Sequence, residues 1–131
     1  MKNFLFLVIT FLAIQIVSAQ DAANVPNDIV YTSAKVDVQP QFSGGNEAFF
    51  KFIGDHYKMP NVDKFSGKVY VTFVIEIDGS LTDIEVLRDI GYGTGKEAIR
   101  VLKLSPKWKP AEQNGQKVRC SYSLPIALKS E

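Results

Sequence analysis

The most constraining feature of this sequence is a run of alternating residues that follows Gly67 and ends at a two-residue turn, Asp78-Gly79. Apolar residues recur there at every second position, the period of a β-strand that buries one face: Val69, Val71, Phe73, Ile75 and Ile77. Asp-Gly favours the positive φ angles of a tight hairpin turn. We therefore expect a second strand from Leu81 to about Arg88, antiparallel to the first.

Two helices and a third strand are expected around this hairpin. The first helix runs from about Glu47 to His56, because Phe49, Phe52, Ile53 and Tyr57 form one apolar stripe. The second begins at a T-x-x-E capping-box pattern, Thr94 to Glu97, and ends before Ser105-Pro106. Residues 117–128 alternate again and predict the last strand.

The predicted fold is α+β: a three-stranded antiparallel sheet with both helices packed on one face. The connection through the second helix is expected to be right-handed, which places the last strand beside the first and gives the spatial order 2-1-3. The last strand is then an edge of the sheet. Trp108 lies between two prolines in the connection to this strand and is expected to cover the end of the core.

The first 19 residues have the composition of a secretory signal peptide. Lys2 precedes the apolar run from Phe4 to Val17, and Val17-Ser18-Ala19 resembles a cleavage site. The alternative is an uncleaved membrane anchor, although a 14-residue helix is short for a bilayer. The predicted organisation is a signal peptide at 1–19, a flexible lead-in at 20–39 with a short extended piece near Ile29, and a domain at 40–131.

The charge and cysteine content exclude several classes of protein. The chain has 15 basic and 14 acidic residues, and this balanced charge favours binding to neither nucleic acid nor an anionic membrane. The single cysteine, Cys120, cannot form an internal disulfide and is in phase with the apolar residues of its strand, so we expect an inert core thiol.

No constellation of residues predicts catalysis, a metal site or a cofactor site. His56 is the only histidine and has no evident nucleophile as a partner, and Asp83 and Glu85 are typical of a solvated strand face. The glycines at 91, 93 and 95 lack the spacing of a phosphate-binding loop. The sequence therefore predicts a binding protein rather than an enzyme. The edge strand, whose backbone can accept an added strand from a peptide, is the expected binding surface.

Several short motifs in a fixed order carry a resemblance to a known family. They are Pro40-Gln-Phe-Ser-Gly-Gly45, Gly67-Lys-Val-Tyr-Val-Thr-Phe-Val-Ile75, Asp78-Gly79, Glu97-Ala-Ile-Arg100, Ser105-Pro-Lys-Trp-Lys-Pro110, Asn114-Gly115 and Tyr122-Ser-Leu-Pro125. From about Val38 to Leu128 the chain resembles the C-terminal domain of TonB proteins, in particular the version common in the Bacteroidetes.

The resemblance implies a periplasmic domain that binds the TonB-box peptide of outer-membrane receptors by β-strand addition, in TonB-dependent transport. It implies no enzymatic activity and no cofactor. The peptide-binding residues that it implies are Lys117, Val118, Arg119, Cys120, Ser121, Tyr122 and Ser123 of the last strand, with His56, Tyr57 and Lys58. The partner is then a TonB-dependent receptor or another envelope protein, and strand exchange at the same edge would give a homodimer.

The sequence departs from a full TonB protein at its N-terminus. Residues 1–20 contain no histidine, which the family's anchor carries, and only Pro26 and Pro40 precede the domain instead of a long proline-rich spacer. We therefore expect an exported periplasmic protein that does not transduce energy alone. Two alternatives remain open: an inner-membrane-anchored energy transducer, and an envelope enzyme or small-ligand binder.

Overall fold

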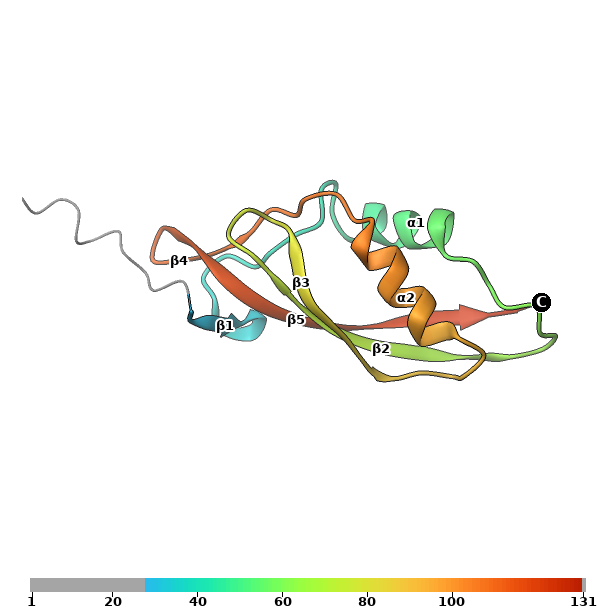
Figure 1. The fold of residues 1–131 in the computed structure, drawn as a ribbon. Coiled ribbons are helices and arrows are strands. Elements are labelled where there is room, and N and C mark those ends of the chain that lie inside the picture. Colours follow the sequence, from blue (N-terminus) through green and yellow to red (C-terminus); the bar gives the residue numbers. More distant parts are fainter. Residues whose placement is uncertain (1–27, 131) are drawn as a thin grey trace, which may run out of the picture.

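The computed structural model describes residues 28–130 and contains two α-helices and five β-strands (Figure 1). The predicted signal peptide and the first part of the lead-in lie outside the described residues. The elements in chain order are β1 (Val30–Thr32), the 3-10 helix η3 (Ser33–Lys35), α1 (Asn46–His56), β2 (Ser66–Ile75), β3 (Leu81–Arg88), α2 (Thr94–Lys103), β4 (Ala111–Gln113) and β5 (Gln116–Lys129).

The centre of the sheet confirms the predicted order of the three long strands. β2 lies between β3 and β5 and is antiparallel to both. The β2–β5 ladder is the longest, from Ile75 opposite Cys120 to Ser66 opposite Lys129. The β2–β3 ladder has a register shift between Thr72 and Val74, where Asp83 adopts a φ angle of 50°. Such a bulge bends and twists the strands locally.

The prediction of a three-stranded, fully antiparallel sheet is wrong. The sheet has five strands and is mixed, because β1 pairs with β5 in parallel and β4 pairs with the start of β5. Val38 and Gln41 add isolated bridges to Glu112 and Lys109. The folded unit therefore includes part of the segment that the sequence analysis assigned to the lead-in.

Both helices lie on one face of the sheet, as predicted (Figure 1). Every second side chain of β2 points into the core, and Val69, Val71, Phe73 and Ile75 are at most 1% exposed. The stripe on α1 supplies Phe49 and Ile53, and α2 supplies Ala98, Val101 and Leu102. Apolar side chains that recur with period 2 in the strands and about 3.6 in the helices thus pack together in one core.

Trp108 lies in the middle of an aromatic cluster rather than at the margin of the core. Its side chain is 5% exposed, and its ring centroid lies 5.2–5.7 Å from those of four other rings, Phe42, Phe49, Phe73 and Tyr122. The indole N–H donates to Ser105 Oγ (3.0 Å). The backbone N–H of Trp108 donates to the carbonyl of Gly79 in the β2–β3 turn (2.8 Å). The connection between α2 and β4 is thereby attached to the hairpin.

Gly79 is required by this attachment as well as by the turn. Its φ angle is 89°, a region that L-residues with side chains rarely adopt. A Cβ atom at this position would also overlap the carbonyl oxygen of Trp108. The Asp-Gly turn predicted from the sequence therefore serves two purposes, of which only the local one could be read from the dipeptide.

The predicted capping box at the start of α2 is absent. Gly93 is the N-cap, and Thr94 is the first residue of the helix. The Thr94 hydroxyl donates to the carbonyl of Gly91 (2.7 Å), and the Glu97 carboxylate accepts bonds from Lys58 and Arg100 instead. These interactions join α2 to the segment after α1.

Candidate functional site

The structure separates the predicted last-strand residues into three groups. Lys117 and Val118 pair with β4. Arg119, Cys120 and Ser121 have β1 on one side, and Ser121 and Cys120 also pair with Val74 and Ile75 of β2 on the other. Only Tyr122 and Ser123 lie beyond β1. The expectation that β5 is an edge strand along the whole of 117–123 is therefore wrong at residues 119–121, where β1 pairs with it.

The predicted segment His56–Lys58 is held by α2. The Tyr57 hydroxyl donates to the carbonyl of Thr94 (2.7 Å), and burial raises the pKa of Tyr57 to about 12. The Lys58 backbone N–H donates to the carboxylate of Glu97 (2.7 Å). The Arg100 guanidinium donates to the carbonyl of His56 (2.8 Å). These bonds hold the segment that follows α1 against α2, away from the start of β5.

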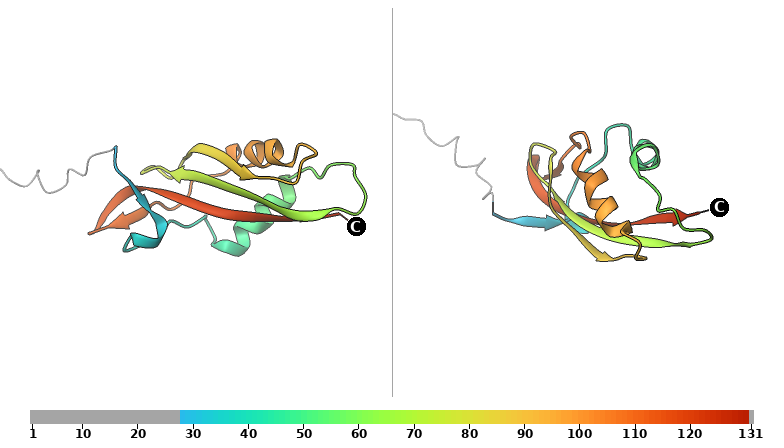
Figure 2. Two further views of the ribbon diagram at one scale, coloured as in Figure 1. Left: turned by 90° about the horizontal axis from the view of Figure 1, so that it is seen from below. Right: turned by 45° about the vertical axis from the view of Figure 1, so that its right-hand side comes forward.

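Tyr57 instead faces the far end of β5, across a groove of about 510 Å³. One wall comes from α1 and its exit, with Phe50, Ile53, Gly54, Tyr57 and Met59, and the other from β5 residues 125–129, with Lys68 of β2. Figure 2 (left) shows α1 on the side of β5 that is away from β2. The groove therefore follows the outer edge of β5.

The lining of this groove is mainly apolar, and some of it is open to solvent. Phe50 is 56% exposed and Met59 is 42% exposed. Sequence reasoning missed Phe50, because it points away from the apolar stripe of α1, whereas Met59 lies in the predicted segment from His56 to Pro60 but was not named as a binding residue. Exposed large apolar side chains beside a groove are typical of a surface that contacts another molecule.

The outer edge of β5 is an open strand edge from Tyr122 to Lys129. Among residues 28–130, β1 pairs with β5 only as far as Ser121 and β4 only as far as Val118, so β2 is the strand that pairs with β5 beyond Ser121. Pro125 lies in the middle of the open part. Because proline has no N–H to donate, it is accommodated in a strand where its nitrogen faces an open edge. By alternation, the N–H groups of Ser123 and Ala127 face outward with it.

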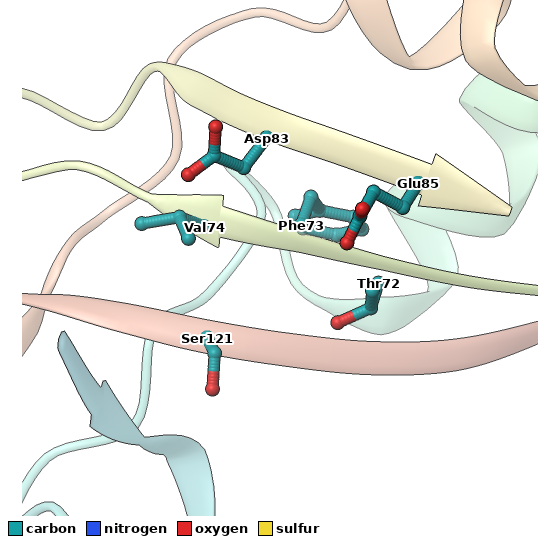
Figure 3. A pocket seen from close by; sticks show the side chains of 6 residues that line it. All are labelled: Thr72, Phe73, Val74, Asp83, Glu85 and Ser121. Atoms are coloured by element: carbon teal, nitrogen blue, oxygen red, sulfur yellow. The ribbon is translucent and has the colours of Figure 1, made fainter. Parts of the chain in front are cut away.

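The helix-free face of the sheet carries a second hollow, of about 450 Å³ (Figure 3). Asp83 and Glu85 of β3, Thr72 of β2 and Ser121 of β5 line it. Beside it, Arg119 forms an ion pair with Glu76 (2.7 Å), and this guanidinium holds the pKa of Glu76 below its usual range. In the described part of the chain, no group of three or more His, Cys, Asp or Glu side chains is arranged to hold a metal ion.

Cys120 is fully buried in a small cluster with Ala111 and Val118. Burial raises the pKa of its thiol to about 11, so the reactive thiolate is scarce near neutral pH. The expected position of this residue in a core is confirmed. Among residues 28–130, no helix is long and apolar enough to cross a membrane.

The fold and the groove define an α+β domain with an incompletely paired sheet edge. Comparison with protein families matches residues 63–129, just over half of the chain, to the family described as Gram-negative bacterial TonB protein C-terminal. The chain therefore belongs to the TonB C-terminal family. This is a family of non-enzymatic protein-interaction domains with a role in envelope transport. No curated protein and no solved structure gives a significant match.

Proposed function

We propose that this domain binds an extended peptide segment of an envelope protein by strand addition along the outer edge of β5. The observation that carries the proposal is the open edge from Tyr122 to Lys129 next to the apolar groove. An added strand would satisfy the outward backbone groups of β5. Two of the residues implied by the resemblance, Tyr122 and Ser123, begin this edge, and Tyr57 lines the groove.

The chemistry of the groove favours a peptide with apolar side chains at alternate positions. In an added strand, every second side chain points to the helix side of the sheet. There it would meet Phe50 and Met59, whose exposed surface it would remove from water. The intervening side chains would face the polar, helix-free side of the sheet.

The partner class that fits the family is a TonB-dependent outer-membrane receptor, which would offer its TonB-box peptide. We place the protein in the periplasm, exported by residues 1–19, and associate it with TonB-dependent transport rather than with energy transduction by itself. The basic start, apolar run and small residues at 17–19 support export. The mass of the mature N-terminus tests this location, because cleavage predicts a chain that begins at Gln20.

Calorimetric titration of the mature protein with synthetic TonB-box peptides tests the proposed binding. We expect saturable binding with a negative heat-capacity change, because apolar surface is buried. A scrambled peptide of the same composition is the control. Equal affinity for the native and scrambled sequences, or no binding to any TonB box, would contradict the proposal.

A further inference from the structure

The short strand β1 occupies the first part of the same outer edge of β5. Val30, Tyr31 and Thr32 lie parallel to β5, opposite Arg119, Cys120 and Ser121. Beyond Thr32 the chain leaves the sheet as the 3-10 turn η3. β1 therefore ends where the open part of the edge, Tyr122–Lys129, begins. Without β1, the edge available to another strand would extend from Arg119 to Lys129.

One side chain of β1 contacts the body of the domain. Val30 and Thr32 are exposed, whereas Tyr31 is half-buried and packs against the cluster of Ala111, Val118 and Cys120. The backbone ladder and this ring thus form the attachment. The cluster under the ring makes a binding site for an aromatic side chain at the position opposite Cys120.

The attachment is small compared with the rest of the sheet. β1 pairs over three residues, whereas β2 and β5 pair over ten. Short, exposed segments with few apolar contacts open locally at a small fraction of the free energy of global unfolding. β1 is therefore a part of the sheet that can leave β5 without unfolding the β2–β5 ladder.

We propose that β1 is an intramolecular occupant of the peptide-binding edge, which a partner strand with an aromatic residue opposite Cys120 displaces. This inference rests on the proposed function and adds a regulation of the same site. A partner strand would run parallel to β5 there, as β1 does. The apparent affinity for a partner is the intrinsic affinity multiplied by the fraction of molecules in which β1 is detached. An attached β1 would therefore weaken binding of any partner that needs residues 119–121.

The thiol of Cys120 reports whether β1 is attached. It is the only cysteine in the chain and is 0% exposed beside Tyr31. We expect a thiol reagent to label the mature Tyr31→Ala variant about tenfold faster than the wild type, which corresponds to about 1.4 kcal/mol of lost attachment. Thr32→Ala, on the exposed side of the same strand, and Tyr31→Phe, which keeps the ring, should label at nearly the wild-type rate. A wild-type rate in Tyr31→Ala would overturn the inference.

A synthetic peptide that copies residues 28–34 tests whether the edge accepts a separate strand. At about millimolar concentration, the effective concentration typical of a short tether, it should slow the labelling of Tyr31→Ala, and a copy with alanine in place of the tyrosine should not. Equal labelling rates with either peptide would overturn the inference. If Tyr31→Ala melts at the assay temperature, Val30→Pro replaces it, because Val30 is exposed and its substitution leaves the cluster intact.

The TonB-box titration separates this inference from the proposed function. Displacement predicts that TonB-box peptides bind Tyr31→Ala more tightly than the wild type. Equal affinity for both proteins would refute displacement and leave strand addition at Tyr122–Lys129 standing. Protection of Cys120 by the 28–34 peptide without binding of any TonB box would refute the proposed partner and leave β1 as the occupant.

Discussion

Replacement of Trp108 by alanine is expected to lower the free energy of unfolding by about 3–5 kcal/mol, the range for a large aromatic residue in a core. The ring is 5% exposed and contacts four other aromatic rings from three parts of the chain. A domain of this size has a total stability of about 5–15 kcal/mol. The substitution should therefore bring the protein close to unfolding at physiological temperature. Urea unfolding followed by circular dichroism measures the effect.

Leu87→Ala is the matched control for this prediction. Leu87 is 64% exposed on β3, so its truncation should change the free energy of unfolding by no more than about 0.5 kcal/mol. A loss below about 1 kcal/mol for Trp108→Ala would mean that the aromatic cluster is not a principal part of the core, because cavity formation at such a site typically costs several times more.

Replacement of Ala127 by proline is expected to weaken binding of a TonB-box peptide about tenfold to hundredfold without unfolding the domain. Alternation with Pro125 directs the Ala127 N–H outward, so a proline there removes a donor to the added strand. Leaving the acceptor on the peptide without a partner costs about 1–3 kcal/mol, and 1.4 kcal/mol is tenfold in affinity. Pro125 shows that the strand accommodates this residue at an outward position.

Ala127→Ser separates the backbone effect from the side-chain effect. This variant keeps the backbone N–H and replaces one small exposed side chain with another. Its affinity for the TonB-box peptide should therefore equal that of the wild type. Calorimetric titration of both variants with the same peptide makes the comparison, and circular dichroism checks that each is folded. Equal affinities for Ala127→Pro and Ala127→Ser would place the added strand elsewhere.

The central hairpin was predictable because its pattern is local and repeated. Five alternating apolar residues and the Asp-Gly turn are enough to define β2 and the start of β3, and the observed bounds of β3, Leu81–Arg88, agree with the prediction. The apolar stripe similarly identified α1, which ends at His56 as expected. In each case a period set by backbone geometry repeats often enough to be recognised without a partner.

β1 was only partly predictable, because it owes its place to contacts with distant residues. Three residues are too few to establish a period, and the partner of Tyr31 is Cys120, at the other end of the chain. The same holds for Glu97. Its position three residues after Thr94 fits a capping box, but Lys58 and Arg100 provide stronger, charge-assisted partners.

The strand that carries the proposed site, β5, was predicted from the sequence, but the pairing that leaves only its second half open was not. Alternation identified β5. The strands that pair with its first six residues, β4 and β1, are too short to show a period in the sequence. The groove depends on where α1 ends over the sheet, which follows from the packing of Tyr57 against α2. Such relations between elements are set by tertiary structure and leave no periodic trace in the sequence.

Amide hydrogen exchange of Ser123 and Ala127 tests the central claim most directly, because these N–H groups face the edge where the added strand would bind. At a TonB-box peptide concentration of about 100 times the dissociation constant, we predict that their exchange slows about hundredfold. The amides of Leu124 and Ile126, which face β2, should change far less. Unchanged exchange at Ser123 and Ala127 in a saturated complex would contradict strand addition along the outer edge of β5.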